Sequence, residues 1–164
     1  MDPAGIVMTA AGGGTAVAVD LRSRRVPNIL TLGVAVIGLT LATMKVTRVT
    51  PVEGALGCAV GLLLMLPGHL IGATGAGDVK LLAAFGTLLG PGRTAFAFVY
   101  TALAGGVLAL IVAMNRRRTR TTVCRALTVM NPSVVAAIER SSEDNRFAYA
   151  PAVAIGALAA ALGL

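Results

Sequence analysis

Long blocks of apolar residues, separated by short polar segments, make up most of the chain. Blocks of about 18 or more apolar residues are typical of helices that cross a membrane. The pattern predicts an all-α fold, a polytopic membrane helix bundle of about six transmembrane helices that forms a single domain over residues 1–164. The predicted spans cover residues 4–20, 28–44, 53–71, 79–89, 94–114 and 148–164.

The fourth predicted span is the shortest of the six. It covers residues 79–89 and ends at Gly90-Pro91-Gly92. A helix of that length, at a rise of about 1.5 Å per residue, crosses about half of a ~30 Å hydrocarbon core. The segment could be a half-helix or could begin earlier, so the sequence leaves open whether it crosses the membrane fully.

The distribution of basic residues predicts how the bundle is oriented. The chain is 56% hydrophobic and only 13% charged, and eleven of its fourteen Lys and Arg lie in or beside segments 21–27, 72–78 and 115–147. Connecting segments on the cytoplasmic side of membrane proteins carry an excess of Lys and Arg. We therefore expect these three segments to face the cytoplasm and both termini to lie on the other side.

The net charge of +7 does not favour a nucleic-acid partner, because Trp is absent and aromatic residues make up only 4% of the chain. Base stacking needs aromatic side chains, so we expect contact with the lipid bilayer and no nucleic acid. No Cys-x-x-Cys pair occurs, which leaves a cysteine-based zinc site without support. The polar segment 115–147 either binds anionic lipid through its arginines or docks a protein substrate.

Two of the seven acidic residues, Asp20 and Asp78, adjoin apolar spans at the end that is predicted to be cytoplasmic. An ionisable group next to the membrane core is costly and is a candidate functional residue. Each has an ordinary alternative. Asp20 could pair with a nearby arginine such as Arg22, and Asp78 could cap a helix N-terminus.

The two aspartates are more informative as a pair. Both are predicted at the same face and at similar depth, so helix packing could join them although they are 58 positions apart (78 minus 20). Two carboxyl groups in contact share a proton. Such a pair can hydrolyse a peptide bond, because one carboxylate activates water while the protonated partner polarises the scissile carbonyl.

The segments around the two aspartates resemble a known family. Gly75-Ala76-Gly77-Asp78-Val79-Lys80 is similar to the GxGDxK motif of the type IV prepilin peptidases, which are GXGD membrane aspartyl proteases. The run from Asp20 through Arg22, Arg24 and Arg25 to Pro27-Asn28 resembles the first-aspartate segment of that family. Phe147 to Ala152 resembles the start of its last helix.

The resemblance implies an aspartic endopeptidase in the cytoplasmic (inner) membrane of a prokaryote, with its active site facing the cytoplasm. It would remove the basic leader from prepilin or pseudopilin substrates, as in type IV pilus assembly and protein secretion, and would need no metal and no cofactor. Asp20 and Asp78 carry over as the catalytic pair. Gly75, Gly77 and Lys80 carry over as motif residues, and Pro27 and Asn28 belong to the segment that would help to position the substrate.

The chain looks like the small Tad/Flp-type member of the family. Larger members carry an extra N-terminal region with cysteine pairs and also methylate the new N-terminus. Only nineteen residues precede Asp20 here, and no cysteine pair exists. We therefore do not expect methyltransferase activity.

A function of another class also fits two carboxyls at a membrane border, namely a small proton-coupled transporter or channel. It would favour ionisable groups near mid-membrane and broken helices in repeated halves, and neither is evident. Three further residues have weaker signals. Lys80 could simply extend to the lipid headgroups, His69 is expected at a helix end, and Tyr149 could help to shape the site.

Overall fold

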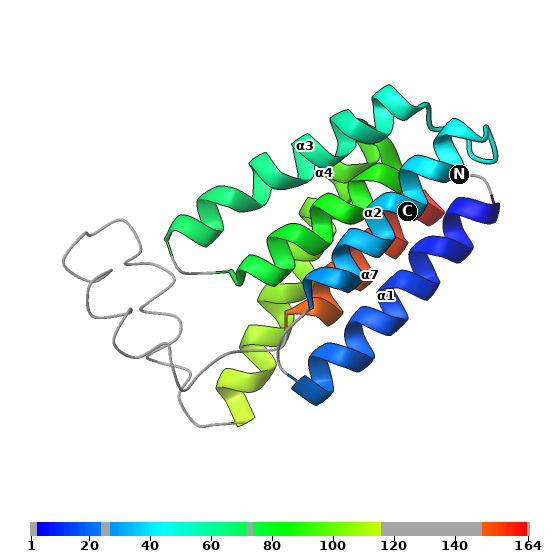
Figure 1. Cartoon of the computed structure of the whole chain (residues 1–164). Coiled ribbons are helices and arrows are strands. Elements are labelled where there is room, and N and C mark those ends of the chain that lie inside the picture. The colour runs from blue at the N-terminus through cyan, green and yellow to red at the C-terminus, as the bar shows by residue number, and fades with distance from the viewer. Residues whose placement is uncertain (1–2, 24–26, 72–73, 116–148, 164) are drawn as a thin grey trace.

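Every regular element in the described part of the chain is an α-helix. The computed structural model describes residues 3–23, 27–71, 74–115 and 149–163. Its helices are α1 (Pro3–Ser23), α2 (Asn28–Thr43), α3 (Pro51–Leu70), α4 (Ala76–Asn115) and α7 (Ala150–Leu162). The predicted all-α bundle is confirmed (Figure 1). The predicted polar segment 115–147 lies, after Asn115, outside the described residues.

Helix α4 contains a sharp reversal at Gly90. This residue has φ 74° and ψ 172°, which are non-helical values within α4. A glycine is needed here because residues with a Cβ atom rarely adopt a positive φ. Figure 1 shows the chain turning back at this point, so the two halves of α4 correspond to the fourth and fifth predicted spans. The count of six membrane spans stays a prediction.

The first half of α4 forms the centre of the bundle. Residues 81–90 are all buried, and Phe85 is the largest fully buried side chain. Helix α3 approaches this half closely, because Gly57 faces the backbone of Gly86 and a Cβ atom on either glycine would overlap the other residue. Small residues that allow backbones to approach in this way are typical of helix packing in membranes.

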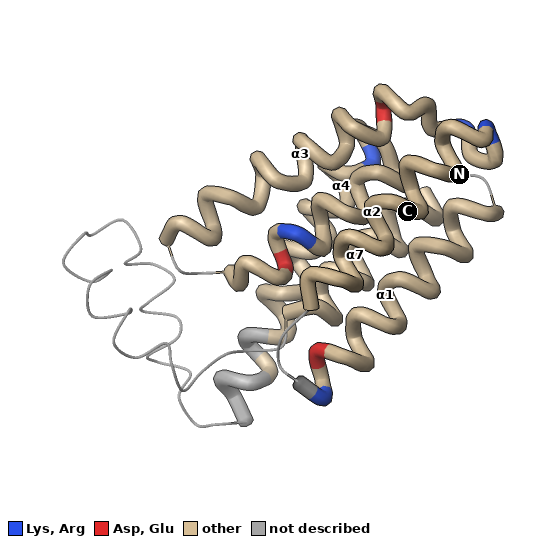
Figure 2. Tube along the Cα trace, viewed as in Figure 1, with Lys and Arg blue, Asp and Glu red and all other residues tan. Residues whose placement is uncertain are grey.

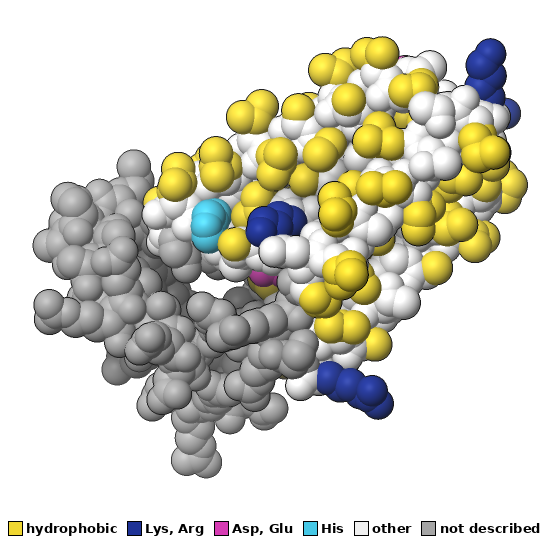
Figure 3. Space-filling view, in the orientation of Figure 1, with side chains coloured by type: hydrophobic (Ala, Val, Ile, Leu, Met, Phe, Trp, Pro, Cys, Tyr) yellow, Lys and Arg dark blue, Asp and Glu magenta, His cyan; other side chains and the backbone are white. Residues whose placement is uncertain are grey.

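The outer surface of the bundle is strongly apolar. Large hydrophobic side chains such as Ile29, Leu63 and Leu103 are exposed, and Figure 3 shows hydrophobic side chains spread over the visible face. In the part of the chain that the structure describes, three helical segments are long and apolar enough to cross a membrane, namely Pro3–Arg22, Pro51–Leu70 and Ala76–Leu108. Exposure of so much apolar surface to water would be unfavourable, so the chain is a membrane protein.

Charged residues lie at the two ends of the bundle (Figure 2). One end carries the start of α3, where Thr50 and Glu53 form a reciprocal capping box. The backbone N–H of Thr50 donates to Glu53 Oε2 at 2.8 Å, and the N–H of Glu53 donates to Thr50 Oγ1 at 3.3 Å. Asp20 and Asp78 lie at the other end, because α1 ends there and α4 begins there.

Candidate active site

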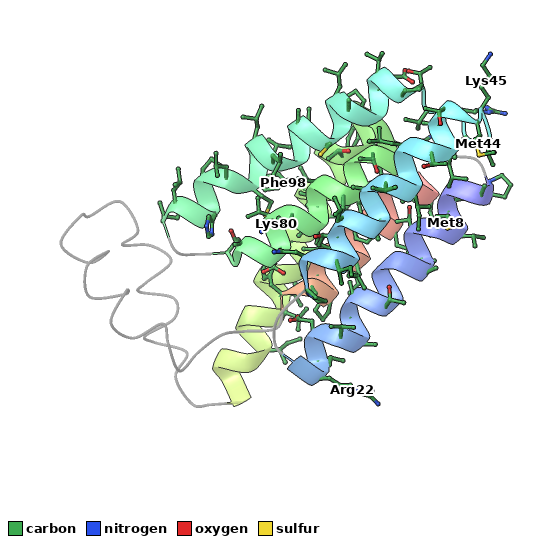
Figure 4. All side chains as sticks on the ribbon, viewed as in Figure 1. Met8, Arg22, Met44, Lys45, Lys80 and Phe98 are labelled. Carbon is green, nitrogen blue, oxygen red and sulfur yellow. The ribbon has the colours of Figure 1, made fainter. Side chains whose placement is uncertain are left out.

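Asp20 lies in the last turn of α1, and its side chain is buried, with 5% of its surface exposed. Its carboxylate oxygen Oδ2 accepts a hydrogen bond from the backbone N–H of Ala150 at 3.3 Å. Ala150 is the first residue of α7, so this donor is one of the free N–H groups at a helix N-terminus. Arg22 points away from the bundle (Figure 4), whereas Arg24 and Arg25 lie outside the described residues.

Asp78 lies in the first turn of α4, and 8% of its surface is exposed. The helix begins at Ala76, so the interpretation of Asp78 as the cap residue itself is wrong. The carbonyl of Gly75 accepts the N–H groups of Asp78 at 3.1 Å and of Val79 at 3.3 Å, which places Gly75 at the cap.

The glycine before α4 lets the Asp78 side chain fold back. The backbone of Gly75 is hydrogen-bonded to the Asp78 carboxyl group. A Cβ atom on Gly75 would lie 3.0 Å from Asp78 Oδ2, so any larger residue would crowd the carboxyl. Gly77, the second motif glycine, is half-buried inside the first turn. The close approach of the Asp78 carboxyl group therefore explains why residue 75 is a glycine.

The bundle brings the two aspartates to the same end, and their carboxyl groups interact electrostatically. Helix α1 runs antiparallel to the first half of α4. Gly12 lies against Phe85, whereas Asp20, nearer the end of α1, interacts electrostatically with Asp78 at the start of α4. Two buried carboxyl groups that interact in this way cannot both ionise easily.

Lys80 and Asn28 connect the two motif segments. The Lys80 ammonium donates a hydrogen bond to Asn28 Oδ1 at 3.0 Å, across 52 positions of sequence. Figure 4 shows Lys80 extending from the start of α4 toward α2. Lys80 is exposed but bonded to a defined partner, which differs from simple extension toward lipid headgroups. Pro27 precedes Asn28, and its carbonyl accepts the N–H groups of Leu30 and Thr31, so it begins α2.

Sequence reasoning did not identify the Ala150 N–H as the partner of Asp20. A backbone donor has no residue type of its own, and the one local signal was Pro151, which marks the first turn of a helix. Tyr149, adjacent in sequence, is half-buried and donates a hydrogen bond to the Thr101 carbonyl at 3.4 Å. The Ala150 N–H extends the site to α7.

Other features do not extend the site. His69 is exposed near the end of α3, and its Nδ1 lies 3.1 Å from the Thr74 carbonyl oxygen, as expected for a helix-end residue. A hollow of about 320 Å³ lies at the opposite end of the bundle, where Arg48, Glu53 and Arg93 contribute to its lining. Within the described residues, no three His, Cys, Asp or Glu side chains converge as metal ligands.

Comparison with known proteins identifies one family. The sequence model of the type IV leader peptidase family matches residues 8–110. The matched range is more than half of the chain and contains both aspartates, Asn28 and Lys80. Neither the curated proteins nor the solved structures give a significant match.

Proposed function

Because the chain belongs to the type IV leader peptidase family, we propose that it is an aspartic endopeptidase that removes the basic leader peptide from prepilin- or pseudopilin-type substrates. Membership of this family shows that the chain is a leader-peptidase-type protease. Its long apolar helices show that it is a membrane protein. The observation that carries the proposed aspartic mechanism is the electrostatic interaction between two buried carboxyl groups, Asp20 and Asp78, at one end of the bundle.

In the proposed reaction, one of the two carboxyls is ionised and the other is protonated. The ionised carboxyl takes a proton from a water molecule, whose oxygen attacks the carbonyl carbon of the scissile peptide bond. The protonated carboxyl donates a hydrogen bond to the carbonyl oxygen. When the C–N bond breaks, the leaving amine takes a proton from the pair, which returns to its starting state. Two carboxyls suffice for these steps, so the proposal includes no metal and no cofactor.

The fixed partners of the carboxyls support this assignment. The Ala150 N–H holds Asp20, and the Gly75 backbone holds Asp78. Groups held in this way need little rearrangement when the substrate binds. Both aspartates lie within one turn of a helix end, whereas proton-coupled transport favours ionisable groups near mid-membrane. Position in the bundle therefore favours peptide hydrolysis over transport.

We further propose that the active site faces the cytoplasm of a prokaryotic cell, from the inner membrane. Eleven of the fourteen Lys and Arg lie in or beside sequence segments 21–27, 72–78 and 115–147, which the positive-inside rule assigns to the cytoplasm, and Asp20 and Asp78 adjoin or belong to the first two of these segments. A substrate of the proposed class has a basic leader followed by a long apolar helix. The apolar outer surface of the bundle would let such a helix lie in the bilayer beside the site.

The test is leader cleavage in proteoliposomes. Wild-type enzyme is incubated with a prepilin that is encoded in the same genome, and Asp20→Asn and Asp78→Asn variants are compared with it. We expect each variant to lose at least about 1,000-fold in kcat, because the missing carboxyl can neither accept nor donate the proton. Glu53→Gln is the matched control, because it makes the same chemical change at the far end of the bundle. Normal cleavage by either aspartate variant would refute the proposal.

A further inference from the structure

Tyr149 lies at the junction between α7 and the candidate active site. It is the N-cap residue of α7, and its carbonyl accepts the N–H groups of Ala152 at 3.0 Å and Val153 at 3.2 Å. The next peptide group carries the Ala150 N–H that binds Asp20 Oδ2. Any displacement of Tyr149 therefore moves the hydrogen-bond donor that holds the Asp20 carboxylate.

The ring of Tyr149 is seated against a glycine on the second half of α4. A Cβ atom at Gly105 would overlap Cε2, Cζ and the hydroxyl oxygen of Tyr149. At Gly106, the next residue, a Cβ atom would meet no atom within 4 Å. The hydroxyl group donates to the Thr101 carbonyl at 3.4 Å, which is long for a hydrogen bond and indicates a small contribution. The contact with Gly105 is thus the main anchor.

A second glycine contact fixes the same helix pair farther along. A Cβ atom on Gly156 of α7 would overlap the Thr101 side chain and crowd the Ala97 carbonyl of α4. Tyr149 against Gly105 and Gly156 against Thr101 together set the register of α7 along α4. Because α7 is held at two points, its first peptide group has a defined position beside α1.

We propose that Tyr149 is a positioning residue for the catalytic pair. Its ring, seated against Gly105, fixes the start of α7 so that the Ala150 N–H holds the Asp20 carboxylate beside Asp78. This inference rests on the proposed function. It assigns to Tyr149 and Gly105 a role in the geometry of the site, although neither side chain takes part in the chemistry.

The inference predicts which changes affect cleavage. Tyr149→Ala removes the ring, and Gly105→Ala fills the space that the ring occupies. For each variant we expect kcat to fall about 100-fold while KM stays within about threefold, as for a catalytic group displaced by ~1 Å. Tyr149→Phe keeps the ring and should stay within about threefold of wild type. Gly106→Ala is the matched control for Gly105→Ala and should cleave normally.

A purely structural role would lower the amount of folded protein without changing the behaviour of the remaining enzyme. The discriminating readout is therefore the pH–rate profile of Tyr149→Ala. A carboxylate that loses an N–H donor is protonated more readily, so we expect the acid limb to move toward higher pH. The profile of Tyr149→Phe should coincide with that of wild type.

A second readout does not depend on cleavage. Hydrophobic carbodiimides react with protonated carboxyl groups, and mass spectrometry measures the labelling of Asp20. We expect faster labelling of Asp20 in Tyr149→Ala and Gly105→Ala than in wild type or Gly106→Ala. If wild type cleaves no prepilin, the proposed function fails, and the labelling rates still decide this inference. Wild-type labelling and an unchanged pH profile in Tyr149→Ala, or equal activity of Gly105→Ala and Gly106→Ala, would overturn it.

Discussion

Glu53 and Asp78 occupy the same local position in two helices and have different surroundings. Each carboxyl lies three residues after the cap residue, Thr50 before α3 and Gly75 before α4. Glu53 is exposed and exchanges hydrogen bonds with the side chain and backbone of Thr50. Asp78 is buried, its cap has no side chain, and its carboxyl interacts with Asp20.

The comparison shows what determines the role of a helix-start carboxyl. Local sequence places both groups near free backbone N–H groups, where a negative charge is stabilised. The exposed carboxyl of Glu53 only caps its helix, whereas Asp78 is a candidate catalyst because it is buried and has a second carboxyl group nearby. Substitutions that exchange features between the two positions test this distinction.

Lengthening the Asp78 side chain should have the largest effect. Asp78→Glu keeps the charge but moves the carboxyl by more than 1 Å, and we expect kcat to fall by at least about 100-fold. The reciprocal change, Glu53→Asp, should leave kcat within about twofold, because that carboxyl only caps α3. Cleavage kinetics in proteoliposomes measure both. A fully active Asp78→Glu enzyme would contradict the proposed role of this carboxyl.

Giving Asp78 a cap like that of Glu53 should also impair cleavage. In Gly75→Thr, the new Cβ atom would lie 3.0 Å from Asp78 Oδ2, and the hydroxyl would compete for the carboxylate. We expect a roughly 10- to 100-fold loss in kcat, with a melting temperature in detergent at or above that of wild type because a cap is gained. Unchanged kcat in a well-folded Gly75→Thr enzyme would show that the absence of a side chain at position 75 has no catalytic importance.

The hydrogen bond between Lys80 and Asn28 should have a moderate effect. Lys80→Met and Asn28→Ala each remove one partner of an exposed bond. A bond of this kind contributes about 0.5–1.5 kcal/mol to holding two segments together. We expect its loss to reduce the population of the active geometry, and thus kcat/KM, roughly 2- to 10-fold. The double variant should be no worse than either single variant if the two act through this bond. Independent, multiplying losses would indicate separate roles for the two side chains.

Removing the cap of α3 should affect stability alone. Thr50→Ala deletes the hydroxyl that accepts the Glu53 N–H and is expected to cost about 1 kcal/mol of folding free energy. The melting temperature in detergent should fall, while kcat per folded molecule should not change, because α3 starts at the end far from the aspartates. A specific loss of kcat in Thr50→Ala would show that the two ends of the bundle are coupled.

The motif residues that flank the aspartates came from the family resemblance, and their roles stay predictions. Sequence alone predicted the helical fold, which is confirmed, and marked the two aspartates as candidate site residues. It did so because apolar block length and helix-end chemistry are local properties. Gly90-Pro91-Gly92 marked the interruption of α4, but its φ angle and the reversal of the chain became visible only in three dimensions.

Contacts between distant segments could not be read from the sequence. The bond between Lys80 and Asn28, the Ala150 donor to Asp20 and the seat of Tyr149 on Gly105 all depend on how helices pack. Gly105 and Gly106 are adjacent residues of the same type, yet of the two only Gly105 lies against a neighbouring side chain. Periodicity and motif spacing give no information about which of two adjacent glycines receives a partner.

We propose that Asp20 and Asp78 act as one catalytic unit, and the double variant Asp20→Asn/Asp78→Asn distinguishes this from two independent roles. Residual kcat in proteoliposomes is compared among the two single variants, the double variant and Glu53→Gln. Groups that act as a unit are strongly non-additive, so we expect the double variant to be no less active than either single variant. Separate losses that multiply in the double variant, or cleavage by either single variant at the rate of Glu53→Gln, would contradict it.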